Sequence, residues 1–205
     1  HIGLIGGSAV PKPGEVTLAH RGVLFLDEFP EFDRRVIETL RQPLEDRTVS
    51  ISRAKGSMTF PADIMLVAAM NPCPCGNRGS KKECICAPRD LLRYSRKISG
   101  PIMDRIDIWL SMPNVEYRKL EEDASGELSS TIQRRVAKAR ATQERRFKKT
   151  HTRSNAEMSP KDIKNHAPLG ADEKKLLEEA ARALDLSARA YHRVIKVART
   201  IADLA

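Results

Sequence analysis

The sequence has no apolar run that approaches the roughly 20 residues a helix needs to cross a bilayer. Its first residues, HIGLIGGSAV, also lack the basic segment and following apolar segment of a secretory signal. We therefore expect neither a membrane-spanning nor a secreted protein, and we expect a cytoplasmic location. The chain starts at His1 in place of Met, which we interpret as the start of a fragment.

Cysteine is scarce, with 4 in 205 residues, and all four lie in one segment. In C73-P-C75-G-N-R-G-S-K-K-E-C84-I-C86, two C-x-C pairs are separated by eight residues. Four thiolates can enclose a tetrahedral zinc ion, which would stabilise a loop that has no core of its own. The usual zinc spacing is C-x-x-C, so free thiols stay an alternative, and disulfides are disfavoured in a cytoplasmic chain. We expect structural zinc at Cys73, Cys75, Cys84 and Cys86.

Positive charge is unevenly distributed. The chain has 36 basic and 27 acidic residues, a net charge of +9, and residues 131–153 alone hold nine Lys or Arg against one Glu, or +8. Such a block can bind nucleic acid phosphates by releasing their counterions. The alternative is a solvated helix face, because Ile132, Val136 and Ala139 recur at helical spacing and leave the charges outward.

Three short runs rich in Val, Ile and Leu, VLFLD (23–27), IMLVAAM (64–70) and IDIWLSM (106–112), predict buried strands. Their continuous apolar character is typical of a parallel sheet that helices cover on both faces. Between the first two, residues 34–45 predict a helix that Pro43 ends. Residues 48–60 then predict a hairpin with a basic tip.

After Pro113 the composition changes to a polar linker and then to helical patterns. Ser159 and Pro160 predict one helix start, and Gly170 predicts the next. Two apolar stripes predict the buried faces of the last helices, which are Leu176, Leu177, Ala180, Ala181 and Leu184, and then Val194, Ile195, Ala198, Ile201 and Ala202. A truncated α/β domain is therefore followed by a small helical one.

Polar residues follow two of the predicted strands. Asp27 and Glu28 end the first run, which is the Walker B pattern of nucleotide hydrolases: the first acid holds magnesium and the second polarises the attacking water. Asn71 ends the second run, at the edge where ligands sit in open α/β sheets. Taken alone, Asn71 is better explained as a polar residue that ends a strand before Pro72.

Four ordered segments together resemble a known family. They are GEVTLAHRGVLFLDEFPEF, TVSISRAKGSMTFPADIMLVAAMNPCPCG, ISGPIMDRIDI and LSARAYHRVIKVARTIADL. In this order they resemble the magnesium-chelatase-like AAA+ ATPases, and within them the bacterial competence-associated ComM/YifB group. The resemblance spans nearly the whole chain.

The resemblance implies a role for each matching residue. Asp27 and Glu28 match the Walker B acids, and Asn71 matches sensor 1. Arg105 matches the arginine finger, which stabilises charge on a neighbouring subunit's γ-phosphate. Arg189 matches the sensor 2 arginine of the helical lid.

The two arginines have plainer interpretations when taken alone. Arg105 lies between Asp104 and Asp107 and is compatible with a surface ion pair, and Arg189 is compatible with a solvated helix cation. The resemblance further places residues 3–19 in a loop that projects towards the ring's channel.

Lys12 lies near the tip of that loop, and Arg53 and Lys55 lie at the turn of the hairpin before sensor 1. We expect these three cations to contact nucleic acid backbone. Subunit contact is the alternative for both loops.

One motif of the family is absent. No G-x-x-x-x-G-K-[ST] occurs, so the phosphate-binding loop is missing and we expect no ATPase activity from this chain alone. The expected fold is α/β, a truncated AAA+ P-loop core whose parallel sheet lacks the Walker A strand, followed by an all-helical lid. We expect a core at 1–115, a polar linker and basic helix at 116–158, and the lid at 159–205.

The resemblance implies an ATP-driven motor that uses magnesium. We expect a homo-hexameric ring that acts on DNA, as a branch-migration helicase in recombination during natural transformation. One alternative is the motor subunit of a magnesium chelatase, although such subunits generally lack the CPCG insert. The other is a zinc-stapled nucleic-acid-binding module without enzyme activity.

Overall fold

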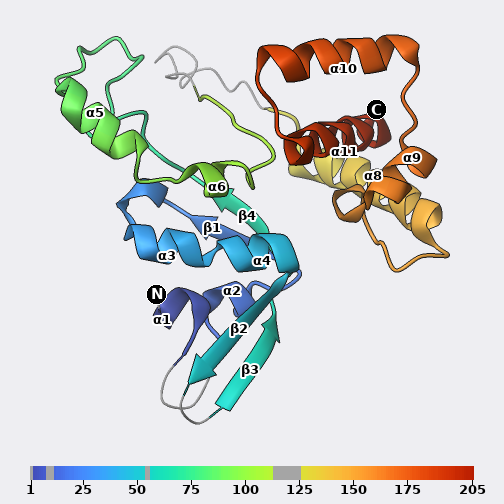
Figure 1. Ribbon diagram of the computed structural model, residues 1–205, viewed down its shortest axis with the longest axis horizontal. Coiled ribbons are helices and arrows are strands. Elements are labelled where there is room, and N and C mark those ends of the chain that lie inside the picture. The colour runs from blue at the N-terminus through green and yellow to red at the C-terminus, as the bar shows by residue number, and fades with distance from the viewer. Residues whose placement is uncertain (1, 8–11, 54–55, 113–125) are drawn as a thin grey trace. The chain divides into compact units, whose positions relative to one another are not determined.

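The computed structural model describes residues 2–7, 12–53, 56–112 and 126–205 (Figure 1). The chain divides into two compact units, residues 1–114 and residues 115–205. Residues 116–158, which we expected to form a segment of their own, fall in the same unit as residues 159–205. The division into three segments stays a prediction.

A small parallel sheet lies at the centre of the first unit. β1 (Val23–Leu26) pairs with β4 (Met65–Ala68), in the register Val23↔Met65 to Leu26↔Ala68. The two predicted strands are therefore present and parallel. The third is not: residues 106–112, all of them described, form no strand, and residues 107–112 are all exposed. The apolar composition favours a strand there, but a strand also needs a neighbouring strand to which its backbone can hydrogen-bond, and composition does not provide one.

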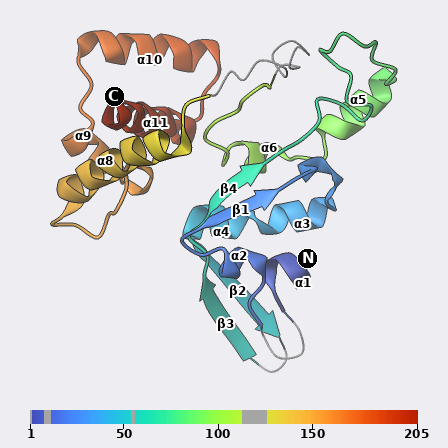
Figure 2. The same ribbon diagram turned by 180° about the vertical axis from the view of Figure 1, so that it is seen from behind.

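Only one face of this sheet is covered. Leu24 and Leu26 are buried in a cluster that includes Ile37 and Leu40, and the helices α3 and α4 lie along this side in both views (Figure 1 and Figure 2). The opposite face is exposed, at 57% for Val23, 59% for Phe25, 55% for Met65 and 41% for Val67. Our expectation of helices on both faces is therefore wrong for the described residues.

Residues 34–45, which we expected to form one helix, form two. α3 (Arg34–Thr39) starts at Asp33, whose side chain accepts a 2.7 Å hydrogen bond from the first turn, and α4 (Arg41–Asp46) follows after Leu40. Pro43 does not end the helix. It lies in the first turn of α4, where the missing N–H is not needed because the residue four positions earlier lies outside this helix.

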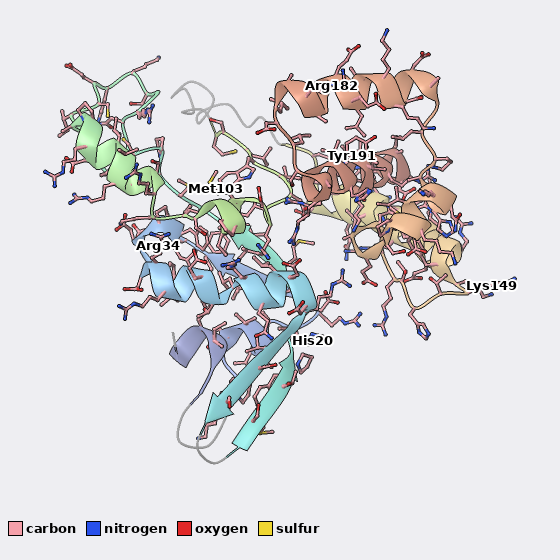
Figure 3. The ribbon with its side chains drawn as sticks, in the orientation of Figure 1. His20, Arg34, Met103, Lys149, Arg182 and Tyr191 are labelled. Atoms are coloured by element: carbon pink, nitrogen blue, oxygen red, sulfur yellow. The ribbon has the colours of Figure 1, made fainter. Side chains whose placement is uncertain are left out.

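The predicted hairpin is confirmed, and it packs against the N-terminal elements. Val16, Val49 and Ile51 belong to one buried cluster. His20, which follows α2 and is labelled in Figure 3, accepts a 3.0 Å hydrogen bond at Nδ1 from the backbone N–H of Asp63, which follows the hairpin. The remaining elements of the unit are α1 (Ile2–Ile5), α2 (Glu15–Leu18), η1 (Phe29–Glu31), β2 (Thr48–Arg53), β3 (Gly56–Pro61), α5 (Pro88–Ser95) and α6 (Gly100–Met103).

The described part of the second unit is helical. Ser159 caps its helix through the backbone N–H of Asp162, and Gly170 precedes the next, so both predicted helix starts are confirmed. Among the described residues, no helix combines the length and the apolar character needed to span a membrane. The elements are α8 (Ser129–Phe147), η2 (Asn155–Glu157), α9 (Pro160–His166), α10 (Ala171–Ala183) and α11 (Ala188–Leu204).

The core of the second unit is smaller than the apolar stripes predicted. α10 and α11 are both described in full: α10 has no buried residue, and Ile195 is the one buried residue of α11. Leu177 and Tyr191 pack partly against the core. The stripe prediction is wrong because Leu176, Leu184, Val194, Ala198, Ile201 and Ala202 are exposed. The core consists of Phe147, Met158, Ile163, Ala167 and Ile195.

A buried polar network joins α8, η2 and α11 instead. Arg146 donates to Asp203 Oδ2 at 2.6 Å and to Asn155 Oδ1 at 2.7 Å, and Asn155 Nδ2 donates to Asp203 Oδ2 at 2.8 Å. The Asn155 backbone N–H donates to Gln143 Oε1 at 3.0 Å. Asn155 is fully buried, so these hydrogen bonds are what make its burial tolerable.

Candidate functional site

The carboxyl end of β1 places two acidic side chains in solvent. Asp27 and Glu28 are both exposed, and Asp27 Oδ1 accepts a 2.8 Å hydrogen bond from the backbone N–H of Glu28. Glu28 adopts the left-handed conformation, with φ 49° and ψ 39°. Residues other than glycine rarely adopt this backbone conformation. It marks a sharp turn between β1 and η1.

The backbone of Ala69 joins this turn to the end of β4. Its N–H donates to Leu26 O at 2.9 Å, and its carbonyl accepts from the N–H of Phe29 at 2.9 Å. Asn71 follows two residues later and is exposed. Asp27, Glu28 and Asn71 therefore follow the same carboxyl edge of two paired parallel strands.

The donor set at this edge fits magnesium. Carboxylate oxygens are the ligands that Mg²⁺ prefers in proteins, and the ion usually keeps several waters, so one or two exposed carboxylates are sufficient. Asp27 and Glu28 supply such oxygens in solvent. The residues present are thus compatible with the expected metal.

Arg105 hydrogen-bonds two groups of its own chain. Its Nη2 bonds the carboxylate of Glu45 on α4, and its Nη1 donates to Pro101 O at 2.6 Å. The side chain is 12% exposed, and its Nε is buried without a hydrogen-bond partner among the described residues. The structure therefore joins Arg105 to Glu45 and not to the acids that follow β1.

Arg189 is the second residue of α11, in the second unit, and is half-buried. Ser187 caps this helix by accepting a 3.1 Å hydrogen bond from the N–H of Ala190. Because α11 starts at this cap, the position of Arg189 in the first turn is fixed by local sequence.

The three proposed nucleic-acid residues lie at or near the edges of the described regions. Lys12 is exposed, and its carbonyl accepts a 3.0 Å hydrogen bond from Gly7 N–H. Arg53 pairs with Gly56 at the end of the hairpin, but its side chain, like the whole of Lys55, lies outside the described residues.

The basic segment contains one cation that serves the core. Arg146 is 9% exposed and belongs to the buried network, so it is not available to a ligand. Arg135 pairs with Glu127 at 2.8 Å on the surface. The exposed cations of the segment include Arg134, Lys138, Arg140, Lys148 and Lys149, the last of which is labelled in Figure 3.

The four cysteines are gathered at one point. Cys73 Sγ lies 3.5 Å from Cys75 Sγ and 3.8 Å from Cys84 Sγ, and Cys75 and Cys84 are 3.7 Å apart. All four sulfurs, including that of Cys86, lie within 4.8 Å of one another. None is in a disulfide among the described residues, which hold every cysteine of the chain. Cys73 is fully buried and the others are half-buried.

The thiols differ in acidity. A hydrogen bond from the backbone N–H of Asn77 lowers the pKa of Cys75 to about 6. Burial, together with the neighbouring sulfurs of Cys75, Cys84 and Cys73, raises the pKa of Cys86 to about 12. Like charges at this distance oppose one another, so complete deprotonation of the cluster requires a cation.

Tyr94 on α5 connects the cysteine segment to the strand edge, and sequence reasoning missed it. Its hydroxyl donates to Asn71 O at 3.1 Å, and the residue is 7% exposed. Burial and then the charge of Glu31 raise the pKa of Tyr94. Lys97 Nζ lies 2.8 Å from Glu31 Oε2 and 5.6 Å from the centre of the Tyr94 ring. No motif in the sequence marks this tyrosine.

Comparison with known proteins covers nearly the whole chain. The family "Magnesium chelatase, subunit ChlI" matches residues 1–120, and "Magnesium chelatase, subunit ChlI C-terminal" matches residues 126–205. "Uncharacterized protein YifB" of Salmonella typhimurium is 43% identical and "Competence protein ComM" of Haemophilus influenzae is 44% identical, each over 98% of this chain. The chain belongs to the magnesium-chelatase-like ComM/YifB family.

The ComM/YifB relatives are longer than this chain, which spans 39% of the length of each of the two. A more distant relative is "DNA replication licensing factor mcm-6" of Caenorhabditis briggsae, which is 27% identical over 85% of this chain and 19% of its own length. The two family matches, over residues 1–120 and 126–205, together cover both compact units.

Proposed function

We propose that this ComM/YifB chain supplies part of the ATP-hydrolysis site of an AAA+ ring motor that acts on DNA. The observation that carries the proposal is the joint position of Asp27, Glu28 and Asn71 after two parallel strands whose ends are hydrogen-bonded through Ala69. We further propose that the motor is a cytoplasmic branch-migration helicase in recombination during natural transformation. The name of the Haemophilus relative, a competence protein, supports this role.

The residues have separate tasks at the site. ATP with its magnesium supplies the phosphoryl group that is transferred to water. Asp27 holds the magnesium, directly or through its waters, and Glu28 polarises the attacking water. Asn71 orients that water or the γ-phosphate. The 205-residue chain alone has no ATPase activity in this proposal, because it contains no G-x-x-x-x-G-K-[ST].

Completion of the site requires a second subunit. Arg105 is assigned to the neighbouring subunit's γ-phosphate, and Arg189 to the nucleotide from the helical lid. For this task Arg105 must exchange its hydrogen bond with Glu45 for the phosphate. A homo-hexamer supplies one such arginine at each interface.

DNA contact is assigned to Lys12, Arg53 and Lys55. Lys12 lies three residues before α2, and Arg53 is the last residue of β2. α2 and β2 share a buried cluster through Val16 and Val49, which supports placing both cations on one packed part of the first unit. The exposed cations of α8 add charge that binds phosphates. One structural zinc ion is assigned to Cys73, Cys75, Cys84 and Cys86; four protein ligands leave it no open catalytic position.

The test uses a full-length protein, extended to the length of its relatives. We expect ATP hydrolysis that branched DNA stimulates, and we expect Glu28→Gln to abolish hydrolysis while ATP binding persists. Glu38→Gln is the matched control: Glu38 on α3 pairs with Arg41 on α4, away from the strand ends, and its replacement should leave the rate unchanged. Full activity in Glu28→Gln would contradict the assignment.

The same assay separates the alternatives. Hydrolysis without DNA stimulation, coupled to magnesium insertion by partner subunits, would identify a chelatase motor, as the matched family's description suggests. No hydrolysis in the full-length protein, with unchanged zinc and DNA binding, would identify a non-enzymatic nucleic-acid-binding module. Replacement of Arg53 and Lys55 by acids should remove salt-dependent DNA binding in the motor.

A further inference from the structure

The segment between Asn71 and α5 has little apolar packing to hold its shape. Residues 72–87 are described throughout and contain no helix or strand. Cys73 is its one buried residue, and Ile85, its large aliphatic side chain, is 83% exposed. A segment of this length without a core is held by something other than hydrophobic burial.

The spacing of the sulfurs matches a tetrahedral metal centre. A tetrahedral thiolate site with metal–sulfur bonds of about 2.3 Å places its sulfurs about 3.8 Å apart. Three of the sulfur–sulfur distances here are 3.5, 3.7 and 3.8 Å. Four sulfur ligands in this geometry select zinc or iron. The backbone N–H of Arg78 also donates to Cys73 Sγ at 3.4 Å, a contact outside the ligand set that orients the sulfur.

The two ends of this segment meet at Asn71. The cysteines begin two residues after Asn71, and the helix that follows them, α5, returns Tyr94 to the Asn71 carbonyl at 3.1 Å. Just beyond α5, Lys97 bonds Glu31 in η1. The next residue, Ile98, belongs to the buried cluster under the sheet. The cysteine segment thus closes a loop on the residue that follows β4.

We propose that the four thiolates bind one zinc ion, and that this ion positions Asn71 by fixing the segment whose far end brings Tyr94 onto the Asn71 carbonyl. Tyr94 is then a positioning residue, since it acts through Asn71. The metal site stands on the geometry of the cysteines alone. Only the consequence for hydrolysis rests on the proposed function.

The metal is tested first, on the 205-residue chain. We expect one zinc and no iron per chain, and four thiols that react with a thiol reagent only after chelation. Cobalt in place of zinc should give the visible absorption of a tetrahedral thiolate site. Cys75→Ser should lower zinc content and Ser80→Ala, a change in the same loop, should not. A metal-free chain with four reactive thiols would overturn the proposal, and one iron would overturn the choice of zinc.

The positioning role is tested by hydrogen exchange with and without a chelator. We expect zinc removal to speed amide exchange in α5 and at residues 69–71, while the hairpin, residues 48–61, keeps its protection. Zinc binding with no effect of its removal on α5 or residues 69–71 would contradict the positioning role. This result does not depend on ATP hydrolysis.

The Tyr94→Phe variant removes one hydroxyl and no zinc ligand. In the full-length protein we expect kcat for ATP to fall about fivefold, the value of one hydrogen bond, with an unchanged KM and a full zinc content. An unchanged kcat in Tyr94→Phe, beside an inactive Glu28→Gln, would refute the positioning role and leave the hydrolysis proposal intact. Activity in both variants would refute the hydrolysis proposal, and the exchange experiment would then decide the positioning role alone.

Discussion

Arg146 on α8 and Asp203 on α11 form a two-pronged ion pair inside the second unit. The Nη1–Oδ2 distance is 2.6 Å, and the side chains are 9% and 3% exposed. This pair, and not the apolar stripe we expected, ties the end of α11 to α8. Loss of one partner leaves a buried charge without compensation.

Asp203→Ala should therefore destabilise the second unit by about 3 to 5 kcal/mol. The matched control is Glu127→Ala, which removes a surface partner of Arg135 and should cost less than about 1 kcal/mol. Thermal unfolding followed by circular dichroism compares the two. Equal losses would show that the buried pair contributes no more than a surface one.

Acid should weaken the second unit through two carboxyl groups. Hydrogen bonds from Arg146 lower the pKa of Asp203, and those from Ser159 lower the pKa of Asp162, each from an ordinary value of 3.8. A lowered pKa in the folded state stabilises at every pH above the unfolded value, and the contribution falls as pH drops through the folded value. The melting temperature should hold down to about pH 4 and then fall. The fall should be smaller in Ser159→Ala, and an identical fall would contradict the role of Asp162.

The two faces of β1 should respond differently to substitution. Leu24→Ala removes a buried side chain and should cost about 2 to 5 kcal/mol. Phe25→Thr, one residue away on the exposed face, should cost less than about 1 kcal/mol in the isolated chain. Urea titration of both variants checks the difference. A large loss in Phe25→Thr would mean that this face is covered in solution.

Gly6 occupies a position that excludes a side chain. Its φ is +99°, and an added Cβ would lie 2.2 Å from Lys12 O. Gly6→Ala should therefore destabilise the first unit by more than about 1 kcal/mol. Gly3→Ala is the control, since nothing lies within 4 Å and alanine favours the helix. The free energy of unfolding, measured for both variants, should fall in Gly6→Ala and should rise or stay unchanged in Gly3→Ala.

The trans role that we propose for Arg105 can be tested by mixing subunits of the full-length protein. Rings built only from Arg105→Ala or only from Glu28→Gln should be inactive. A mixture should regain ATPase activity, because some interfaces then join an intact Glu28 to a neighbour's intact Arg105. Glu45→Gln removes the charge that Arg105 bonds within its own chain and should change kcat in the unmixed ring. Failure of the mixture to regain activity would refute the trans assignment.

Local signals in the sequence predicted local structure well. The hairpin, the cap at Ser159 and the start of α10 after Gly170 each depend on a few adjacent residues, and all are confirmed. The parallel pairing of β1 with β4 was also predicted, because continuous apolar runs favour such strands. Burial was predicted less well, since it depends on which neighbours are present. The exposed side chains of Phe25 and Leu176 have the same pattern in sequence as buried ones.

In the candidate site, too, features set by adjacent residues were predicted and long-range contacts were not. Asp27, Glu28 and Asn71 could be placed at one edge because each follows a predicted strand. The hydrogen bond from Tyr94 to Asn71 spans 23 residues, and that from Arg105 to Glu45 spans 60. Such contacts depend on the path of the whole chain, and no spacing of residues in the sequence predicts them.

Ala69 links the turn that carries Asp27 and Glu28 to the segment that carries Asn71. One peptide unit on each side of its Cα is hydrogen-bonded to the turn after β1, so the two strand ends cannot separate without loss of both bonds. A displacement of Asn71 is thus expected to displace the Glu28 turn as well. The main chain alone therefore couples the position of Asn71 to that of the Glu28 turn.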